Sequence, residues 1–117
     1  MAAPNIVNVA TITGKTAVQA VGTSATAIVS NSGSSGKVFK VNALYVANID
    51  GSAAADITVD LFRSSTAYPI ASTISVPNDA TLDIMSKAIY LEEGDSLRCT
   101  ASASGDLVAV CSYEEIS

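Results

Sequence analysis

The chain has 117 residues and a net charge of −5, and 49% of its residues are hydrophobic against 15% that are charged. This length fits one domain with its own core, so neither a metal nor a disulfide is required for folding. The chain contains no His. It therefore lacks the usual proton shuttle at neutral pH and the commonest transition-metal ligand, which argues against catalytic triads, zinc sites and most acid–base enzymes. We expect a protein that is not an enzyme and binds no cofactor.

The amino-acid composition favours β-structure. Val, Ile and Thr total 32 residues, whereas Leu occurs only six times. β-Branched side chains are stiff and pack well on a pleated surface, so this bias favours strands over helices. We predict an all-β protein.

The first 36 residues form a region with a single charge, Lys15. Two interpretations remain open. Residues 1–36 are either an extended N-terminal arm that pairs with a neighbouring subunit, ahead of a β-sandwich domain at 37–117, or one or two ordinary strands of the same sandwich. The Ser/Gly run at 32–36 is expected to be a flexible connection in either case. The apolar candidates for interface residues in this region are Ile6, Val7, Val9, Ile12, Val18, Val21, Ile28 and Val29.

From residue 37 onward, strand-like segments alternate with turn signals. Residues 37–49 carry apolar side chains at both odd and even positions, which indicates a central strand covered on two sides. In the next segment, Asp60 is expected to face outward, between inward-facing Val59 and Leu61. This spacing is typical of an antiparallel β-sandwich or jelly roll. The predicted strands are 37–49, 55–62, 68–76, 81–84, 88–91, 96–103 and 107–113.

The last two predicted strands, 96–103 and 107–113, suggest a terminal hairpin that contains both cysteines. A two-residue loop would set Cys99 beside Val108 and Val110 and leave Cys111 on the opposite face. A three-residue loop would instead bring Cys99 opposite Cys111. The first register groups more apolar residues together, so we expect two free thiols, as in most cytoplasmic proteins.

An acidic turn, Glu92-Glu93-Gly94-Asp95, precedes this hairpin. Three carboxylates within four residues could bind calcium, but the spacing does not match an EF-hand loop. A glycosidase pair would need two carboxylates facing each other across a cleft. We favour a solvated turn, whose acids face water or meet a basic group of a neighbouring subunit. Glu92, Glu93 and Asp95 are therefore also candidate interface residues.

Two weaker signals have ordinary structural explanations. The run Gly33-Ser-Ser-Gly-Lys37 lacks the spacing of a phosphate-binding loop and precedes a predicted strand rather than a helix. The tyrosines could line a sugar-binding surface, but packing at the margin of the core is the more common role of such residues. These tyrosines are Tyr45, Tyr68, Tyr90 and Tyr113.

Charge is divided unevenly along the chain. Residues 1–49 hold three Lys and no acid, whereas residues 50–117 hold all eleven acids and three basic residues, so the two parts sum to +3 and −8. This asymmetry either arises by chance in a short chain or attracts copies of the chain head to tail. There is no basic patch for nucleic acid, no apolar run long enough to span a membrane, and no signal-peptide pattern at the start. We expect assembly in a cytoplasm.

Four stretches resemble small virion structural proteins of tailed bacteriophages, notably those of marine and cyanobacterial phages. They are the segments 37–60, Ser75-Val-Pro-Asn-Asp-Ala-Thr-Leu82, Tyr90-Leu-Glu-Glu-Gly-Asp-Ser-Leu97 and the closing Ser112-Tyr-Glu-Glu-Ile116. The resemblance covers about residues 37–117, and its motifs are those of strands and turns. It implies a many-copy, non-enzymatic β-sandwich subunit of a virion.

The resemblance also implies partners. A virion subunit of this kind would contact the major capsid protein, or neck or tail proteins, as well as other copies of itself. Capsid decoration fits the neutral N-terminal region best, because strand addition to a neighbour needs main-chain hydrogen bonds and little side-chain specificity. A neck or tail component, or a fibre-associated module that binds carbohydrate or a host surface, is the alternative.

Overall fold

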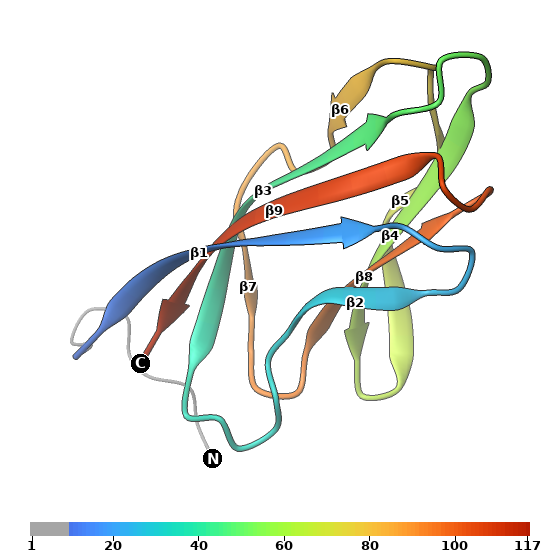
Figure 1. The fold of residues 1–117 in the computed structure, drawn as a ribbon. Coiled ribbons are helices and arrows are strands. Elements are labelled where there is room, and N and C mark those ends of the chain that lie inside the picture. Colours follow the sequence, from blue (N-terminus) through green and yellow to red (C-terminus); the bar gives the residue numbers. More distant parts are fainter. Residues whose placement is uncertain (1–9) are drawn as a thin grey trace.

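The computed structural model describes residues 10–117 and contains nine strands, all paired antiparallel (Figure 1). One sheet has the order β1-β9-β3-β6, with β7 also paired to β3, and the other has the order β2-β8-β4-β5. The predicted all-β antiparallel sandwich is confirmed. The strands are β1 (Ile12–Ala20), β2 (Thr26–Ser30), β3 (Val38–Asn48), β4 (Ala55–Arg63), β5 (Thr66–Val76), β6 (Thr81–Asp83), β7 (Ile89–Leu91), β8 (Ser96–Ala101) and β9 (Leu107–Ile116).

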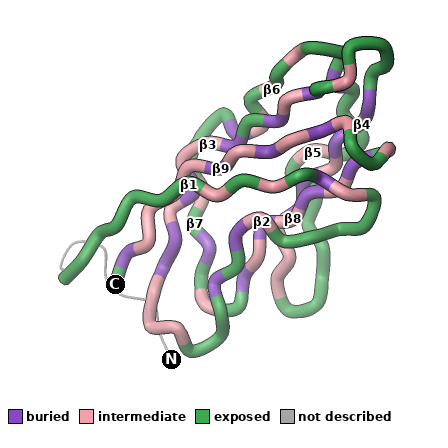
Figure 2. The backbone as a smooth tube through the Cα atoms, viewed as in Figure 1, coloured by how far each residue is buried: buried purple, intermediate pink, exposed green. Residues whose placement is uncertain are grey.

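The strand order is that of a jelly roll, in which strands distant in sequence lie side by side. Along the chain, β1 and β2 fall in different sheets, and so do β3 and β4, and β8 and β9. Within residues 10–117, only β4 and β5 form a hairpin within one sheet, with Arg63 paired to Thr66 across the turn. The core lies between the two sheets, where the buried residues of Figure 2 are concentrated.

The first strands belong to this same sandwich. β1 pairs with β9 from Ile12 to Ala20, and β2 pairs with β8, while Val21 and Val29 are buried in the core. Residues 12–30 therefore follow the second interpretation, ordinary strands of the sandwich, and residue 36 does not divide an arm from a body. Ile6, Val7 and Val9 lie outside the described residues.

The predicted terminal hairpin is wrong. β8 pairs with β2 and β4, whereas β9 pairs with β1 and β3, so residues 102–106 cross from one sheet to the other. Both cysteines consequently face the same core, from opposite sheets, and neither register of the hairpin applies. The expected free thiols are confirmed, since Cys99 and Cys111 form no disulfide.

β3 is the central strand of its sheet, as predicted, but its two apolar sets arise from a bulge. The pairing of β3 with β9 shifts between Val41 and Ala43. A bulge inserts one extra residue and reverses the alternation beyond it. Val41 before the shift and Leu44 after it are therefore both fully buried in the core, although one position is odd and the other even.

Candidate functional site

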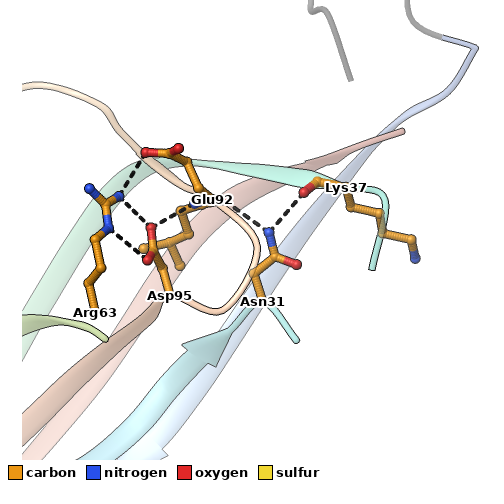
Figure 3. A network of polar contacts seen from close by, with 6 residues as sticks. Asn31, Lys37, Arg63, Glu92 and Asp95 are labelled. Carbon is orange, nitrogen blue, oxygen red and sulfur yellow. Dashed lines mark hydrogen bonds and ion pairs between the residues drawn. The ribbon is translucent and has the colours of Figure 1, made fainter. Parts of the chain in front are cut away.

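The acidic turn is bound to its own chain (Figure 3). Arg63, the last residue of β4, donates from Nε to Asp95 Oδ1 at 2.8 Å and from Nη2 to Asp95 Oδ2, and it also reaches Glu92 Oε2 at 2.9 Å. The side chain of Asp95 is only 2% exposed. The expectation of a solvated turn is therefore wrong for Asp95, and the basic partner is Arg63 of the same chain.

The protonation of Asp95 follows from these contacts. Burial alone would raise the pKa of the carboxyl group, but the hydrogen bonds from Arg63 and from the backbone N–H of Glu92, with the charge of Arg63, outweigh it. The pKa of Asp95 therefore lies below its ordinary value. The same hydrogen bond to Asp95 raises the pKa of Arg63. The pair is thus ionised at neutral pH.

A buried amide next to this pair joins two loops. Asn31, 1% exposed, donates from Nδ2 to Lys37 O at 2.9 Å and to Leu91 O at 3.0 Å. Its backbone N–H donates to Asp95 O, and its carbonyl accepts from Gly94 N–H. The loop after β2 and the turn after β7 are therefore held together at one end of the sandwich (Figure 3).

The Ser/Gly run at 32–36 is also tied into this network, contrary to the expectation of a flexible connection. Ser35 Oγ donates to Asn31 Oδ1, and Gly36 N–H donates to Glu93 Oε2 at 2.8 Å. Gly36 has a φ of 71°, in the left-handed region that favours glycine. Glu93, a candidate interface residue, therefore contacts a loop of its own chain.

A second ionic cluster joins the first half of β1, the C-terminal end of β9 and Lys37, the residue before β3. Glu115 accepts from Lys15 Nζ at 2.9 Å and from Lys37 Nζ at 2.6 Å. The hydrogen bond from Lys37, followed by that from Lys15, lowers the pKa of Glu115, and the Glu115 bond raises the pKa of Lys15. Two of the three cations of residues 1–49 thus share one carboxylate of the same chain, which offsets one of their charges and weakens the case for head-to-tail attraction.

Asp60 lies on the outer face of the β2-β8-β4-β5 sheet, as predicted, but its side chain is buried there. Arg98 on the neighbouring strand β8 donates to both of its carboxylate oxygens, at 2.9 and 3.2 Å. The Arg98 guanidinium also lies 4.0 Å from the ring centroid of Phe62. Sequence reasoning missed this cluster because it depends on the pairing of Asp60 with Arg98, 38 residues apart in the chain.

The two thiols are unsuited to nucleophilic chemistry. Burial raises the pKa of Cys99 to about 12, with smaller contributions from Cys111 and Asp60, and burial raises the pKa of Cys111 to about 11. Only the thiolate is nucleophilic, so at neutral pH both side chains behave as small apolar core residues.

The apolar candidates of the N-terminal region separate into two groups. Val21 and Val29 are buried, and Ile28 packs against the core. Ile12 and Val18 are 57% and 73% exposed on β1. The eight candidate interface residues within residues 10–117 therefore do not form one surface, and β1, largely exposed in Figure 2, is the element that presents Ile12 and Val18 outward.

The candidate aromatic surface does not gather in one place. Tyr113 packs against Phe39, with ring centroids 5.6 Å apart. Tyr45, Tyr68 and Tyr90 are exposed, but they lie on β3, β5 and β7 respectively. Within residues 10–117 no pocket is found, no three potential metal-ligating side chains come together, and no helix is long and apolar enough to cross a membrane.

These features define a jelly-roll β-sandwich with ionic clusters around Asp95 and Glu115, both next to the loop at 31–37, and a third at Asp60 within a sheet. The sequence matches no protein family and no curated protein. Among solved structures, it is similar to one described as Bacillus endospore appendages that form a family of disulfide-linked pili, with a TM-score of 0.53 and 14% identity, over 92% of this chain and 88% of that one. At this identity, the likeness shows the fold alone.

A second solved structure is described as a pentameric capsid protein isolated from metagenomic phage sequences. Its TM-score is 0.45 and its identity 19%, over 86% of this chain and 60% of that one. The present chain thus spans less than two thirds of that protein.

Proposed function

We propose that this chain is a non-enzymatic structural subunit of a phage virion, which decorates the capsid and stabilises it through contacts between subunits. The sequence resemblance over residues 37–117 supports this role. The observation that carries it is the exposure of β1, an uncharged strand apart from Lys15, at the edge of a sheet. An edge strand of this kind presents main-chain groups that another subunit can pair with.

The particle is the place to test this proposal. Purified virions of a phage that encodes this chain are expected to contain it. Density on the capsid surface in their reconstructed map is expected to fit the jelly roll. Its copy number, measured by quantitative mass spectrometry, should scale with that of the major capsid protein. Absence of the chain from purified particles would overturn the proposal.

The position of the density also separates decoration from the alternatives. A neck, tail or fibre-associated subunit would lie at one vertex or along the tail rather than over the capsid surface. The three exposed tyrosines are the observation that favours a carbohydrate- or host-binding module. Because Tyr68 lies on the other sheet from Tyr45 and Tyr90, we expect no binding of the isolated protein on a glycan array.

The contribution of the N-terminal region calls for a truncation that leaves the fold intact. Removing residues 1–31 would delete β1, β2 and the buried Asn31. Removing residues 1–9 leaves every described strand in place. If residues 1–9 carry attachment, this shorter deletion should lower occupancy on the particle without changing the thermal unfolding of the isolated chain.

A further inference from the structure

Of the long edge strands in the described part of the chain, β1 is the least protected against pairing. At the edge formed by β2, the carbonyls of Thr26 and Ala27 accept hydrogen bonds from the side chain of Gln19. At the edge formed by β5, Pro69 lacks an N–H, Thr73 has a φ of 46°, and the pairing with β4 shifts register twice. Prolines, bulges and short strands are the usual devices that prevent edge pairing.

β1 has no proline, bulge or shortened length, and its one charged side chain, Lys15, is paired with Glu115. Its nine residues pair with β9 in one uninterrupted register, contain no proline and carry one charge. The remaining edge is formed by β6 and β7, which are three residues each. Among the strands of residues 10–117, a long, regular and almost neutral edge is therefore present only at β1.

The free groups of this edge can be assigned. Thr11 N–H donates to Ser117 O while Ser117 N–H donates to Thr11 O, and Val21 N–H donates to Leu107 O. Along an antiparallel pair the bonded residues alternate, so the odd residues of β1 are bonded to β9 and the even residues direct their N–H and C=O groups away from it. The five even residues are all exposed: Ile12, Gly14, Thr16, Val18 and Ala20.

We propose that two copies of this chain pair through β1, antiparallel and about a two-fold axis at Thr16. In this register Thr16 faces Thr16 of the second copy, Gly14 faces Val18, and Ile12 faces Ala20. All five outward-directed residues then form hydrogen-bonded pairs, and two five-stranded sheets become one continuous sheet. The proposal deepens the proposed function, because it names a second copy of the subunit as the partner of the exposed strand.

The side chains of β1 suit this register. The large, exposed Val18 and Ile12 would lie opposite the small Gly14 and Ala20, and a threonine pair at the axis is a favourable cross-strand combination. No two charges are directly opposite, since Lys15 would face Ala17. Each Lys15 is also neutralised by Glu115 of its own chain. A two-fold contact of this type is closed and uses the same patch on both copies.

The first test removes one outward N–H from each copy. Thr16→Pro deletes a donor at the axis that β9 does not use, whereas Thr16→Ala keeps that donor. We expect the wild type and Thr16→Ala to sediment as dimers, and Thr16→Pro to raise the dissociation constant at least about tenfold, because two interchain hydrogen bonds are lost. Thermal unfolding monitored by circular dichroism checks that the Pro variant is folded. A monomeric wild type, or a folded Pro variant that dimerises normally, would contradict the pairing.

The second test fixes the geometry and does not depend on the proline variant. In Thr16→Cys, oxidation is expected to give a disulfide-linked dimer, because the two Cβ atoms would face each other across adjacent strands. Ser75→Cys, exposed on β5, is the matched control and should stay monomeric on a non-reducing gel. The native thiols are buried and do not compete. Efficient crosslinking at Ser75 and none at Thr16 would instead place the contact on β5 and overturn the proposal.

These tests are separable from the virion role. If the chain dimerises through Thr16 in solution but is absent from purified particles, the proposed function is refuted and the pairing stands. A chain that decorates particles but neither dimerises in solution nor crosslinks at Thr16→Cys, in solution or on the particle, would refute the pairing alone. In that case β1 would be free to accept a strand from another virion protein.

Discussion

Asp95 is the least exposed charged side chain of residues 10–117, and it depends on one cation. Replacing it by Asn removes the charge that balances Arg63 and weakens the acceptors for Arg63 and the Glu92 N–H. We expect Asp95→Asn to lower the free energy of unfolding by about 2 kcal/mol, below the full range for a buried pair because Arg63 is partly exposed. Urea unfolding measures this loss.

Glu92→Gln is the matched control, since Glu92 binds the same Arg63 but its side chain is 65% exposed. Exposed ion pairs contribute little, so this change is expected to cost less than about 0.5 kcal/mol. Equal losses in the two variants would mean that burial of Asp95 adds nothing to the pair.

The lowered pKa values of Asp95 and Glu115 predict how stability depends on pH. Ordinary values are 3.8 for Asp and 4.5 for Glu, and both groups titrate below these in the folded chain. As pH falls through this range the unfolded state binds protons first, so stability is full above about pH 5 and falls at lower pH. The double variant Asp95→Asn, Glu115→Gln should show a shallower fall in urea midpoint between about pH 5 and about pH 3. Asp50, whose pKa is lowered by hydrogen bonds from Ser52, leaves a residual slope.

At the scale of the elements, Asn31 provides the hydrogen bonds that connect the loop after β2 to the turn after β7. Asn31→Ala leaves the carbonyls of Lys37 and Leu91 without their buried donor. We expect a loss of about 2 to 3 kcal/mol in the free energy of unfolding, and faster hydrogen exchange at the amides of Gly94 and Asp95. Asn78→Ala, which removes one exposed bond to Gly51 O, is the control and should change stability by less than about 0.5 kcal/mol.

The strands could be predicted from the sequence, because alternation and turn residues are local signals. Their pairing could not, because it is decided by contacts between distant residues. The segments containing β8 and β9 are adjacent in sequence and suggest a hairpin, yet residues 102–106 carry the chain into the other sheet. The bulge near Asn42 could not be predicted from alternation either, because a bulge is defined by an extra residue relative to the partner strand, and that pairing is not known from the sequence.

For the candidate site, the sequence likewise predicts the local element, the acidic turn, but not the distant residues that bind it. The acidic turn at 92–95 was identified as a place of interest, but its partner, Arg63, lies 32 residues before Asp95 and no local pattern connects them. Asn31 gave no signal at all, because it stands at the start of a Ser/Gly run typical of a linker. Asn31 and Asp95 are buried because the jelly-roll topology packs the loop after β2 against the turn after β7. Local sequence does not encode this contact.

At the scale of the whole molecule, the two cysteines buried in one core report on global unfolding, because their thiols become accessible only when the sheets separate. Their raised pKa values, about 12 and about 11, keep them as thiols at neutral pH, and the core excludes reagents. We expect no labelling by a thiol reagent in the native state and labelling of both residues in denaturant. The labelling rate at intermediate urea should follow global unfolding, and rapid labelling without urea would show that the sheets separate locally.

Self-association of the whole chain can arise from charge or from main-chain pairing, and salt separates the two. Because the single charge of Glu115 is shared by Lys15 and Lys37, it lowers the positive charge available to attract the acidic part of another copy from +3 to +2. Pairing through β1 joins uncharged groups, whereas attraction between exposed charges is screened within about 10 Å at 0.1 M salt. We therefore expect the dimer dissociation constant, measured by sedimentation, to change less than about threefold between roughly 0.05 M and 0.5 M NaCl. A rise of tenfold or more would restore head-to-tail attraction as the cause of assembly.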